Sequence, residues 1–408
     1  MEKHALQRIL VRSPNWIGDQ VLAFPFFHYL RKNFPHAEIT VCCVPWVADL
    51  QFRTLVDRVI VLPPSAKGSL RSRWRNVKAS GRALSHPEGR PEDRYDLAIA
   101  LPNSFSSALT LWQSHAKIRR GYATEGRSFL LNSHQTWEPS SSVHRAQAYL
   151  ELLPEGIDRT SLTPALEFFD RPAENELDAD LPGEMANFDY RRYWPLSPAD
   201  QSPPLKQPST PYWVLAPGAT AESRRWPLSF WAELALAIYR DRGWPGLIVG
   251  GPSEAPLARE LIHLTRELAA RKQPLQKVGI SGQDPILRDT TARGSIPTLA
   301  PLFQQSEFTV TNESGLAHVA ALCGAFVQIV CGAADPKRTR PIGPGRVQIA
   351  VNPIPCWPCE RNECALPEPR KIECLRGISA ELVWSEILRG LEKETARRSF
   401  RKVSRPSV

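Results

Sequence analysis

The sequence predicts an α/β protein with two Rossmann-like domains whose parallel sheets face a central cleft. Short runs of apolar, β-branched residues alternate with longer segments of helical spacing, which is the pattern of βαβ units. The alternation occurs twice, and a stretch rich in proline separates the two halves. A chain of 408 residues also has room for two hydrophobic cores.

The first half, residues 1–165, has the alternation of a βαβ domain. Glycine and proline interrupt its basic stretch 65–94, where we expect a helix and an excursion from the domain. The expected strands are 8–11, 39–44, 59–62 and 96–101, and the expected helices are 19–33, 104–113 and 144–153.

The second half, residues 211–392, follows a stretch in which regular patterning is lost. Prolines recur throughout 166–210, so we interpret this stretch as a linker with an insertion. The basic tail 393–408 is expected to be disordered. The expected strands of the second half are 212–216, 246–250, 308–311 and 326–331, and the expected helices are 227–242, 253–270, 296–303, 316–323 and 380–391.

The net charge of +9 is compatible with a nucleic acid, an anionic membrane surface, an acidic substrate or simply a mildly basic enzyme. A nucleic-acid surface would interleave aromatic residues with the basic run 67–94, which contains Trp74 alone, so we expect no nucleic-acid partner. Apolar stretches stay well short of about 18 residues, and Arg8, Arg12 and Asp19 interrupt the N-terminal segment. We therefore expect a cytoplasmic protein whose cysteines are mostly reduced.

The turn RSPNWIGD, residues 12–19, follows the first strand and opens the first helix. Asp19 in the first helical turn could simply interact favourably with the helix dipole. Alternatively, a carboxylate at this end of the strand faces the cleft and accepts the proton of a substrate hydroxyl. Gly18 would let another backbone or a ligand approach closely.

Two turns of the second half have features of a phosphate site. In LAPGATAESRRWP, residues 215–227, Arg224 and Arg225 stand with Thr220 near the start of a helix, which suits a diphosphate; the alternative is a solvated loop. In FTVTNESGLAHVAAL, residues 308–322, a strand turns directly into a helix. The first N–H groups of such a helix lack intrahelical partners and bind anions readily.

Five segments stand out in order along the chain: ILVRSPNWIGD at 9–19, LPNSFSSAL at 101–109, the PGA and RRWP ends of 217–227, VTNESGLAHVAAL at 310–322, and the cysteine-containing loop 356–374. Together they resemble the bacterial lipopolysaccharide heptosyltransferases of glycosyltransferase family 9, most of all the heptosyltransferase II type. The resemblance covers nearly the full length except 65–94, 165–210 and the tail. It implies a GT-B fold whose N-terminal domain takes an acceptor sugar and whose C-terminal domain takes ADP-heptose.

The resemblance also implies an inverting, metal-independent transfer without a cofactor, in which Asp19 is the general base. The negative charge that develops on ADP would be stabilised by backbone N–H groups and a guanidinium. The family commonly has Lys where this chain has Arg224, and Asp where it has Glu313; a planar guanidinium keeps the charge and changes its geometry. The residues implied on the acceptor side are Ser13, Asn15, Gly18 and Asn103. Those implied on the donor side are Thr220, Arg224, Arg225, Glu254, Glu313, Ser314, Gly315 and His318.

The eight cysteines fall into two groups. One group has C-x2-C-x4-C-x9-C spacing, which is compatible with a structural zinc site, with reduced thiols or with a disulfide. Its members are Cys356, Cys359, Cys364 and Cys374. The other group lies in apolar segments and is expected to be buried. Its members are Cys42, Cys43, Cys323 and Cys331.

The leading hypothesis is transfer of heptose from ADP-heptose to a sugar, most simply a heptose, of the lipopolysaccharide inner core. Such an enzyme would contact the cytoplasmic leaflet of the inner membrane peripherally, through residues 67–90 or the basic tail. One alternative is a family 9 enzyme with a different acceptor glycan or nucleotide-sugar donor. Another is a non-catalytic nucleotide-binding homologue, against which Asp19 and the cationic turn argue.

Overall fold

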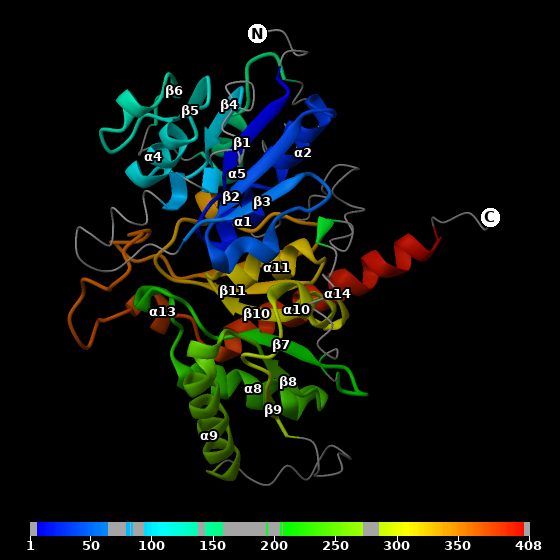
Figure 1. The fold of residues 1–408 in the computed structure, drawn as a ribbon. Helices are drawn as coiled ribbons and strands as arrows, with labels where there is room; N and C mark the ends of the chain where they lie inside the picture. Colours follow the sequence, from blue (N-terminus) through cyan, green and yellow to red (C-terminus); the bar gives the residue numbers. More distant parts are fainter. Residues whose placement is uncertain are drawn as a thin grey trace. The chain divides into compact units, whose positions relative to one another are not determined.

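The protein forms two compact units in the computed structural model (Figure 1). Unit 1 comprises Met1–Pro182 with Asp189–Leu196, and unit 2 comprises Gly183–Phe188 with Ser197–Val408. The structure describes residues 6–63, 79–81, 83–84, 94–137, 143–157, 193–194, 205, 207–271 and 285–403, with the backbone alone for 395–403. The basic run 67–90 therefore falls largely outside the described residues, as does most of the expected linker 166–210.

Unit 1 is built on a six-stranded parallel sheet in the order β3-β2-β1-β4-β5-β6. The first strand pairs with β2 on one side and β4 on the other, so the chain reverses its direction of winding between β1 and β4. This is the strand order of a Rossmann fold. The strands are β1 Arg8–Arg12, β2 Glu38–Cys43, β3 Arg58–Val61, β4 Leu97–Ala100, β5 Ile118–Tyr122 and β6 Ser133–Gln135.

The helices of unit 1 follow the expected positions with one correction. The predicted single helix 19–33 is wrong, because the structure has two helices that meet at Ala23. Pro25 lacks the N–H that would continue the first helix, and it lies in the first turn of the second instead. The helices are α1 Ile17–Leu22, α2 Phe24–Asn33, α4 Phe105–Gln113 and α5 Arg145–Glu151, with the 3₁₀-helices η1 Pro45–Leu50 and η3 Ser128–Leu130.

Unit 2 repeats the same topology. Its parallel sheet has the order β12-β11-β10-β7-β8-β9, so β7 and β10 take the places that β1 and β4 have in unit 1. The strands are β7 Trp213–Ala216, β8 Gly246–Ile248, β9 Leu287–Asp289, β10 Thr309–Asn312, β11 Val327–Cys331 and β12 Val347–Val351. The helices are α8 Leu228–Arg242, α9 Ala255–Arg271, α10 Ile296–Gln305, α11 Gly315–Leu322, α12 Pro336–Thr339, α13 Glu373–Arg376 and α14 Ala380–Val403, with the 3₁₀-helices η6 Glu222–Arg224 and η7 Pro252–Glu254.

The core of unit 2 is rich in aromatic side chains. The ring of Trp213 on β7 stacks on Phe308 at 5.7 Å, and the Trp226 ring meets Trp231 edge-on at 5.2 Å. Trp226 is buried, and its Nε1 donates to the Ile378 carbonyl at 2.9 Å, so its polar atom is satisfied. Burying side chains of this size contributes roughly 1.5–3 kcal/mol each. This packing anchors the end of the loop between β7 and α8.

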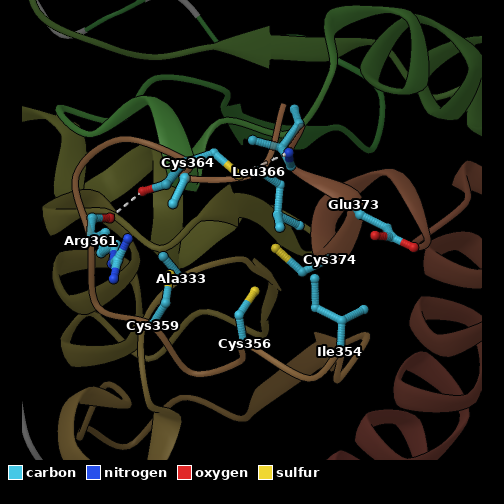
Figure 2. Close-up of a pocket in the computed structure, with 12 residues that line it drawn as sticks. Ala333, Ile354, Cys356, Cys359, Arg361, Cys364, Leu366, Glu373 and Cys374 are labelled. Carbon is cyan, nitrogen blue, oxygen red and sulfur yellow. Dashed lines mark hydrogen bonds between the residues drawn. The ribbon is translucent and has the colours of Figure 1, made fainter. Parts of the chain in front are cut away.

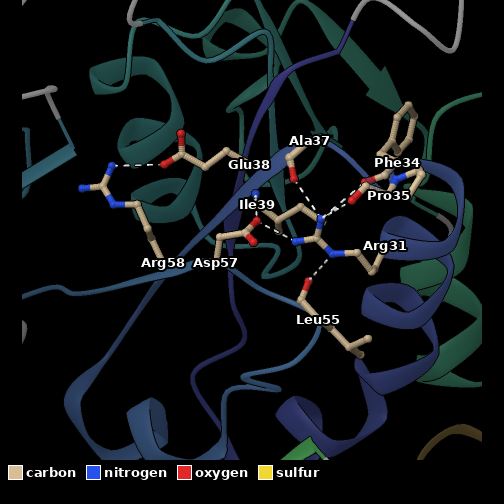
Figure 3. A network of polar contacts seen from close by, with 9 residues as sticks. All are labelled: Arg31, Phe34, Pro35, Ala37, Glu38, Ile39, Leu55, Asp57 and Arg58. Carbon is tan, nitrogen blue, oxygen red and sulfur yellow. Dashed lines mark hydrogen bonds and ion pairs between the residues drawn. The ribbon is translucent and has the colours of Figure 1, made fainter.

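The amino edge of the unit 1 sheet is closed by a polar network around Arg31 (Figure 3). Arg31 donates to the carbonyls of Leu55 and Ala37 at 3.1 and 2.9 Å and to the Asp57 carboxylate at 2.6 Å. The same carboxylate accepts from the Ile39 N–H at 2.6 Å. Because these polar groups satisfy one another's hydrogen bonds, we interpret this edge as structural.

Two further observations bear on the predicted boundaries. Trp194, within the expected linker, packs in unit 1, where its ring stacks on Phe52 at 5.6 Å and its Nε1 donates to the Leu50 carbonyl at 2.8 Å. Helix α14 continues to Val403, well beyond the expected end at Leu391 and into the basic tail; 404–408 lie outside the described residues. Of the helices in the described part of the chain, none is both long and apolar enough to cross a membrane.

Candidate functional site

Each sheet changes its winding direction at a pair of neighbouring strands, and the carboxyl ends of such strands are where α/β folds bind ligands. In unit 2 these strands are β7 and β10, paired through Thr311 and Ala216. The segments that leave this edge are 217–227 and 313–315, the two turns that the sequence indicated for phosphate. The topology therefore brings both turns together.

Asn312, at the end of β10, holds the loop between β7 and α8 at both of its ends. Its Nδ2 donates to the Pro217 carbonyl at 2.5 Å, and its Oδ1 accepts from the Trp226 N–H at 3.1 Å. The side chain is fully buried, so these bonds are shielded from water. Sequence reasoning missed this residue, although an amide at the end of a buried strand, directly before the Glu313–Gly315 turn, was a usable signal.

Glu313 ties the next turn to the end of β11. Its carboxylate accepts from the Ala334 N–H at 2.8 Å and from the Gly332 N–H at 3.1 Å. Burial raises the pKa of this carboxyl group, while the positive charge of Arg224 and these hydrogen bonds oppose the rise. The carboxylate is thus occupied by the fold, which favours a positioning role over direct contact with a ligand.

The two arginines of the cationic turn have different surroundings. Arg225 donates through Nε to the Ala219 carbonyl at 2.8 Å and through a terminal nitrogen to the Thr220 carbonyl at 3.3 Å, so it shapes the loop. Arg224 is half-buried, and its buried Nε has no hydrogen-bond partner among the residues that the structure describes. A buried guanidinium N–H without a partner is costly, and an anionic ligand would relieve that cost. Thr220 is exposed beside it.

Glu254 and Gly218 fit against each other at this edge. Glu254 accepts from the Gly251 N–H at 2.7 Å, and a Cβ on Gly218 would overlap the Oε1 of Glu254. Any larger residue at 218 would therefore displace the Glu254 carboxylate. The contact joins the loops that follow β7 and β8.

Helix α11 starts directly behind the turn. Ser314 is its N-cap without a side-chain cap bond, and the buried Oγ of Ser314 has no partner within the described part of the chain. Gly315 is the first helical residue and keeps the helix start narrow. His318 lies half-buried one turn further on. The arrangement offers N–H groups and a hydroxyl for a phosphate.

The corresponding turn of unit 1 follows β1. Ser13 is fully buried, and its Oγ bonds to the side chains of Gln20 and Gln51, which favours a structural role. Asn15 accepts from a terminal nitrogen of Arg12 at 2.6 Å through Oδ1. Gly18 is buried within α1. Buried side chains therefore hold the turn in a fixed conformation.

Asp19 lies on α1 with its side chain about one-third exposed. The Nε of Arg145, on α5, lies 3.9 Å from its Oδ1, and the same guanidinium lies 5.7 Å from the centroid of the Trp137 ring. A nearby guanidinium stabilises the negative charge of a carboxylate. Asp19 is thus an accessible carboxylate at the carboxyl edge of unit 1, where the sequence predicted a base.

Arg127 organises the loop that carries Asn103, and sequence reasoning missed it. It is fully buried and donates to the carbonyls of Pro102, Ser104 and Tyr122 at 2.7, 2.8 and 2.8 Å. Burial lowers its pKa to about 10. The buried Oδ1 of Asn103 has no partner among the described residues. The loop after β4 therefore keeps a fixed shape at the edge next to Asp19.

The four cysteines of the 356–374 loop line one cavity of about 410 Å³, together with Ser223 and Ala333 (Figure 2). All four are free thiols, and burial raises the pKa of Cys374 to about 11. Within the described ranges, no group of three or more His, Cys, Asp or Glu side chains is arranged to hold a metal ion. The loop packs on the cationic turn, since Ser223 N–H donates to the Asn362 carbonyl at 3.2 Å and the Lys371 ammonium lies 2.6 Å from the Glu222 carboxylate. The other four cysteines are buried, as predicted.

Solved structures share this architecture. The structure of Escherichia coli ADP-heptose LPS heptosyltransferase II is 23% identical, covers 95% of this chain and 100% of that one, and has a TM-score of 0.66. A glycosyl transferase family 9 protein from Veillonella parvula DSM 2008 has the same TM-score at 19% identity, covering 96% of this chain and 99% of that one. These likenesses confirm the predicted α/β fold of the GT-B type.

Proteins related in sequence are heptosyltransferases too. Lipopolysaccharide heptosyltransferase 2 of E. coli (strain K12) is 27% identical over 344 residues, or 82% of this chain and 85% of that protein. Lipooligosaccharide heptosyltransferase 2 of Haemophilus ducreyi is 24% identical, covering 84% and 88%. Fold and relatives together define the class of the protein as a glycosyltransferase. The model of glycosyltransferase family 9 (heptosyltransferase) matches residues 91–369, more than half of the chain. The chain belongs to that family, as the sequence resemblance predicted.

Proposed function

We propose that this enzyme transfers a heptose from ADP-heptose to a sugar of the lipopolysaccharide inner core, with inversion and without a metal ion. The relatives named for lipopolysaccharide and lipooligosaccharide heptosyl transfer support this choice of substrates. The observation that carries the proposal is the edge of unit 2. There the Arg224 Nε–H, which has no hydrogen-bond partner among the described residues, and the start of α11 offer donors for a diphosphate.

On the donor side, Arg224, Ser314 and Gly315 bind the diphosphate of ADP-heptose in this proposal. Negative charge develops on the ADP oxygen as the glycosidic bond breaks, and fixed N–H donors in a shielded site stabilise that charge most strongly. Asn312 and Glu313 act behind them, because their side chains fix the turns that present these donors. Thr220, Glu254 and His318 remain candidates for further contacts with the nucleotide sugar.

On the acceptor side, Asp19 takes the proton of the attacking hydroxyl. The hydroxyl oxygen then forms a bond to the anomeric carbon from the face opposite ADP, the bond between that carbon and the ADP oxygen breaks, and the proton rests on Asp19. One carboxylate suffices for a single displacement with inversion, whereas retention through a covalent intermediate would need a nucleophile as well. Asn15 and Asn103 flank this edge and are the polar candidates for orienting the acceptor.

Peripheral contact with the inner membrane, through residues 67–90 or the basic tail, is part of the same proposal. Basic side chains near anionic lipid contribute about 1 kcal/mol each. We expect binding to vesicles that contain anionic lipid to weaken when the tail is deleted and the 67–90 charges are reversed. Unchanged binding would remove the membrane part and leave the transfer reaction untouched.

The transfer itself is tested by incubating the protein with ADP-heptose and a lipid-free inner-core oligosaccharide that ends in heptose. We expect release of ADP and a product heavier by one heptose, with the new linkage inverted. Activity only with another nucleotide sugar or another acceptor glycan would support the alternative within the family. Binding of ADP-heptose without turnover on any acceptor would support the non-catalytic alternative.

A further inference from the structure

Two large aromatic side chains are exposed at the same edge of unit 1 as Asp19. Trp16 and Trp46 are 60% and 54% exposed. Single exposed apolar residues are common on protein surfaces and need no explanation. These two, however, follow adjacent strands, because Trp16 comes after β1 and Trp46 after β2. Both therefore lie at the carboxyl ends of the strands, where this fold binds ligands.

The orientation of Trp46 is fixed by a hydrogen bond. Its Nε1 donates to the Asn15 carbonyl at 2.6 Å. Asn15 is held in turn by the buried Arg12, whose terminal nitrogen donates to the Asn15 Oδ1 at 2.6 Å. Because the indole N–H is already bonded within the fold, the exposed part of Trp46 is its apolar ring. A rigid side chain held in this way binds with little loss of conformational freedom.

Trp16 is tied to the proposed base by the chain itself. It is the N-cap of α1 and stands three residues before Asp19, so the short helix α1 fixes the two relative to each other. A sugar ring carries hydroxyls around its rim and C–H groups on its faces. An aromatic ring can cover such a face without removing water from the hydroxyls, and sites for small polar ligands combine aromatic walls with a few polar groups.

We propose that Trp16 and Trp46 form an aromatic binding surface for the acceptor sugar, in contact with the C–H face of the ring whose hydroxyl meets Asp19. This inference rests on the proposed function. It assigns acceptor recognition to two apolar side chains rather than to charged groups alone. Binding through ring faces depends weakly on ionic strength, unlike binding of the diphosphate.

The test compares Trp16→Ala and Trp46→Ala with Trp112→Ala in steady-state kinetics on a lipid-free acceptor. Trp112 is a matched control, because it is 51% exposed in the same unit but lies at the end of α4, which runs back from the carboxyl edge. We expect each of the first two changes to raise the acceptor KM about tenfold, equivalent to about 1.4 kcal/mol, while the KM for ADP-heptose stays unchanged. Trp46→Phe keeps a ring and should retain part of the affinity.

Each other outcome has a definite meaning. An unchanged acceptor KM in Trp16→Ala and Trp46→Ala overturns the inference, and so does an equal effect in Trp112→Ala. Weaker vesicle binding with an unchanged KM for the lipid-free acceptor would assign the two rings to a membrane surface and also overturn it. Failure of the wild type to transfer heptose to any heptose-bearing acceptor contradicts the proposed function instead. In that case, tryptophan fluorescence can follow a titration with the same oligosaccharide and still tests the surface. We expect a fluorescence change in the wild type that is lost in Trp16→Ala. If the wild type shows no change, or if Trp16→Ala shows the same change, the inference is overturned.

Discussion

The two units have the same strand order but opposite chemistry at their carboxyl edges. Unit 1 presents the carboxylate of Asp19 and two exposed indoles, whereas unit 2 presents the guanidinium of Arg224 and the start of α11. The shared topology delivers a loop to the same place in each sheet, and the residue types on the loop decide what can bind there. An acid with aromatic rings suits a neutral sugar hydroxyl, and a cation with N–H groups suits a diphosphate.

A second contrast lies within unit 1. Asp57 and Asp19 are both acids paired with an arginine, at opposite edges of the sheet. At the amino edge, Arg31 lies 2.6 Å from Asp57, backbone carbonyls accept its other N–H groups, and the Ile39 N–H donates to the Asp57 carboxylate (Figure 3). At the carboxyl edge, the Nε of Arg145 lies 3.9 Å from the Oδ1 of Asp19. The shorter pair stabilises the amino edge of the sheet, and the longer pair includes the carboxylate that we propose as the base.

The largest effect is expected from Asp19→Asn. An amide cannot accept the hydroxyl proton, so kcat should fall by about 10²- to 10⁴-fold, with the melting temperature unchanged. Asp57→Asn is the matched control: it should lower the free energy of unfolding by about 1 kcal/mol and leave kcat intact. The measurement is steady-state kinetics together with thermal unfolding of both variants. Normal turnover by Asp19→Asn would remove the base assignment.

A smaller effect is expected from Arg127→Lys. A single ammonium cannot reproduce the fork that reaches Pro102, Ser104 and Tyr122, so the loop after β4 should loosen, and the free energy of unfolding should fall by about 1–3 kcal/mol. The acceptor KM should rise and the KM for ADP-heptose should not. Arg119→Lys is the control.

Arg119 also donates to backbone, to the Leu130 and Ala116 carbonyls at 2.9 Å each. It lies near the amino end of β5, away from the carboxyl edge of the sheet. Its replacement should lower stability without changing either KM. Equal rises in acceptor KM for both lysine variants would mean that the effect is general loosening and that Arg127 has no special place at the acceptor edge.

The sequence was sufficient for the fold class, because the apolar strands β1, β4, β7 and β10 are short, buried and flanked by clear turns. The expected strands leave out β5, β6, β9 and β12, and for β5 the omission has a clear reason in its charged residues. β5 reads IRRGY, and Arg120 can lie in it only because its guanidinium bonds to the Leu152 carbonyl and the Ser133 hydroxyl from other segments. Such a tertiary contact has no local signal.

The candidate site was predicted in the same uneven way. The turns that carry Asp19 and Arg224 stand out in the sequence, because charged side chains there make no contribution to a hydrophobic core. The residues that hold those turns, Asn312 and Arg127, bond to backbone distant in the chain, and only the folded structure reveals the partners. For the same reason the sequence could not separate Arg224 from Arg225, whose guanidinium bonds to its own loop.

The smallest effect concerns pH. Burial raises the pKa of Glu313, so the folded protein binds this proton at a pH where the unfolded chain, whose Glu side chains have a pKa of about 4.3, has lost it. The wild type therefore gains stability from this group as pH falls through that window, and Glu313→Gln cannot. The melting temperature of the wild type minus that of Glu313→Gln should increase from pH 7 toward pH 4. A constant or shrinking difference would show that the carboxyl group is not held in the buried state described here.

The central claim is that the carboxyl edge of unit 2 binds the nucleotide and the carboxyl edge of unit 1 binds the acceptor. It is tested most directly by calorimetric binding of ADP to Arg224→Met and Asp19→Asn. Loss of a charged hydrogen-bond donor to phosphate should weaken ADP binding about tenfold or more in Arg224→Met, and the affinity of Asp19→Asn should equal that of the wild type. Unchanged ADP affinity in Arg224→Met, or an equal loss in Asp19→Asn, would contradict the assignment of the nucleotide to unit 2.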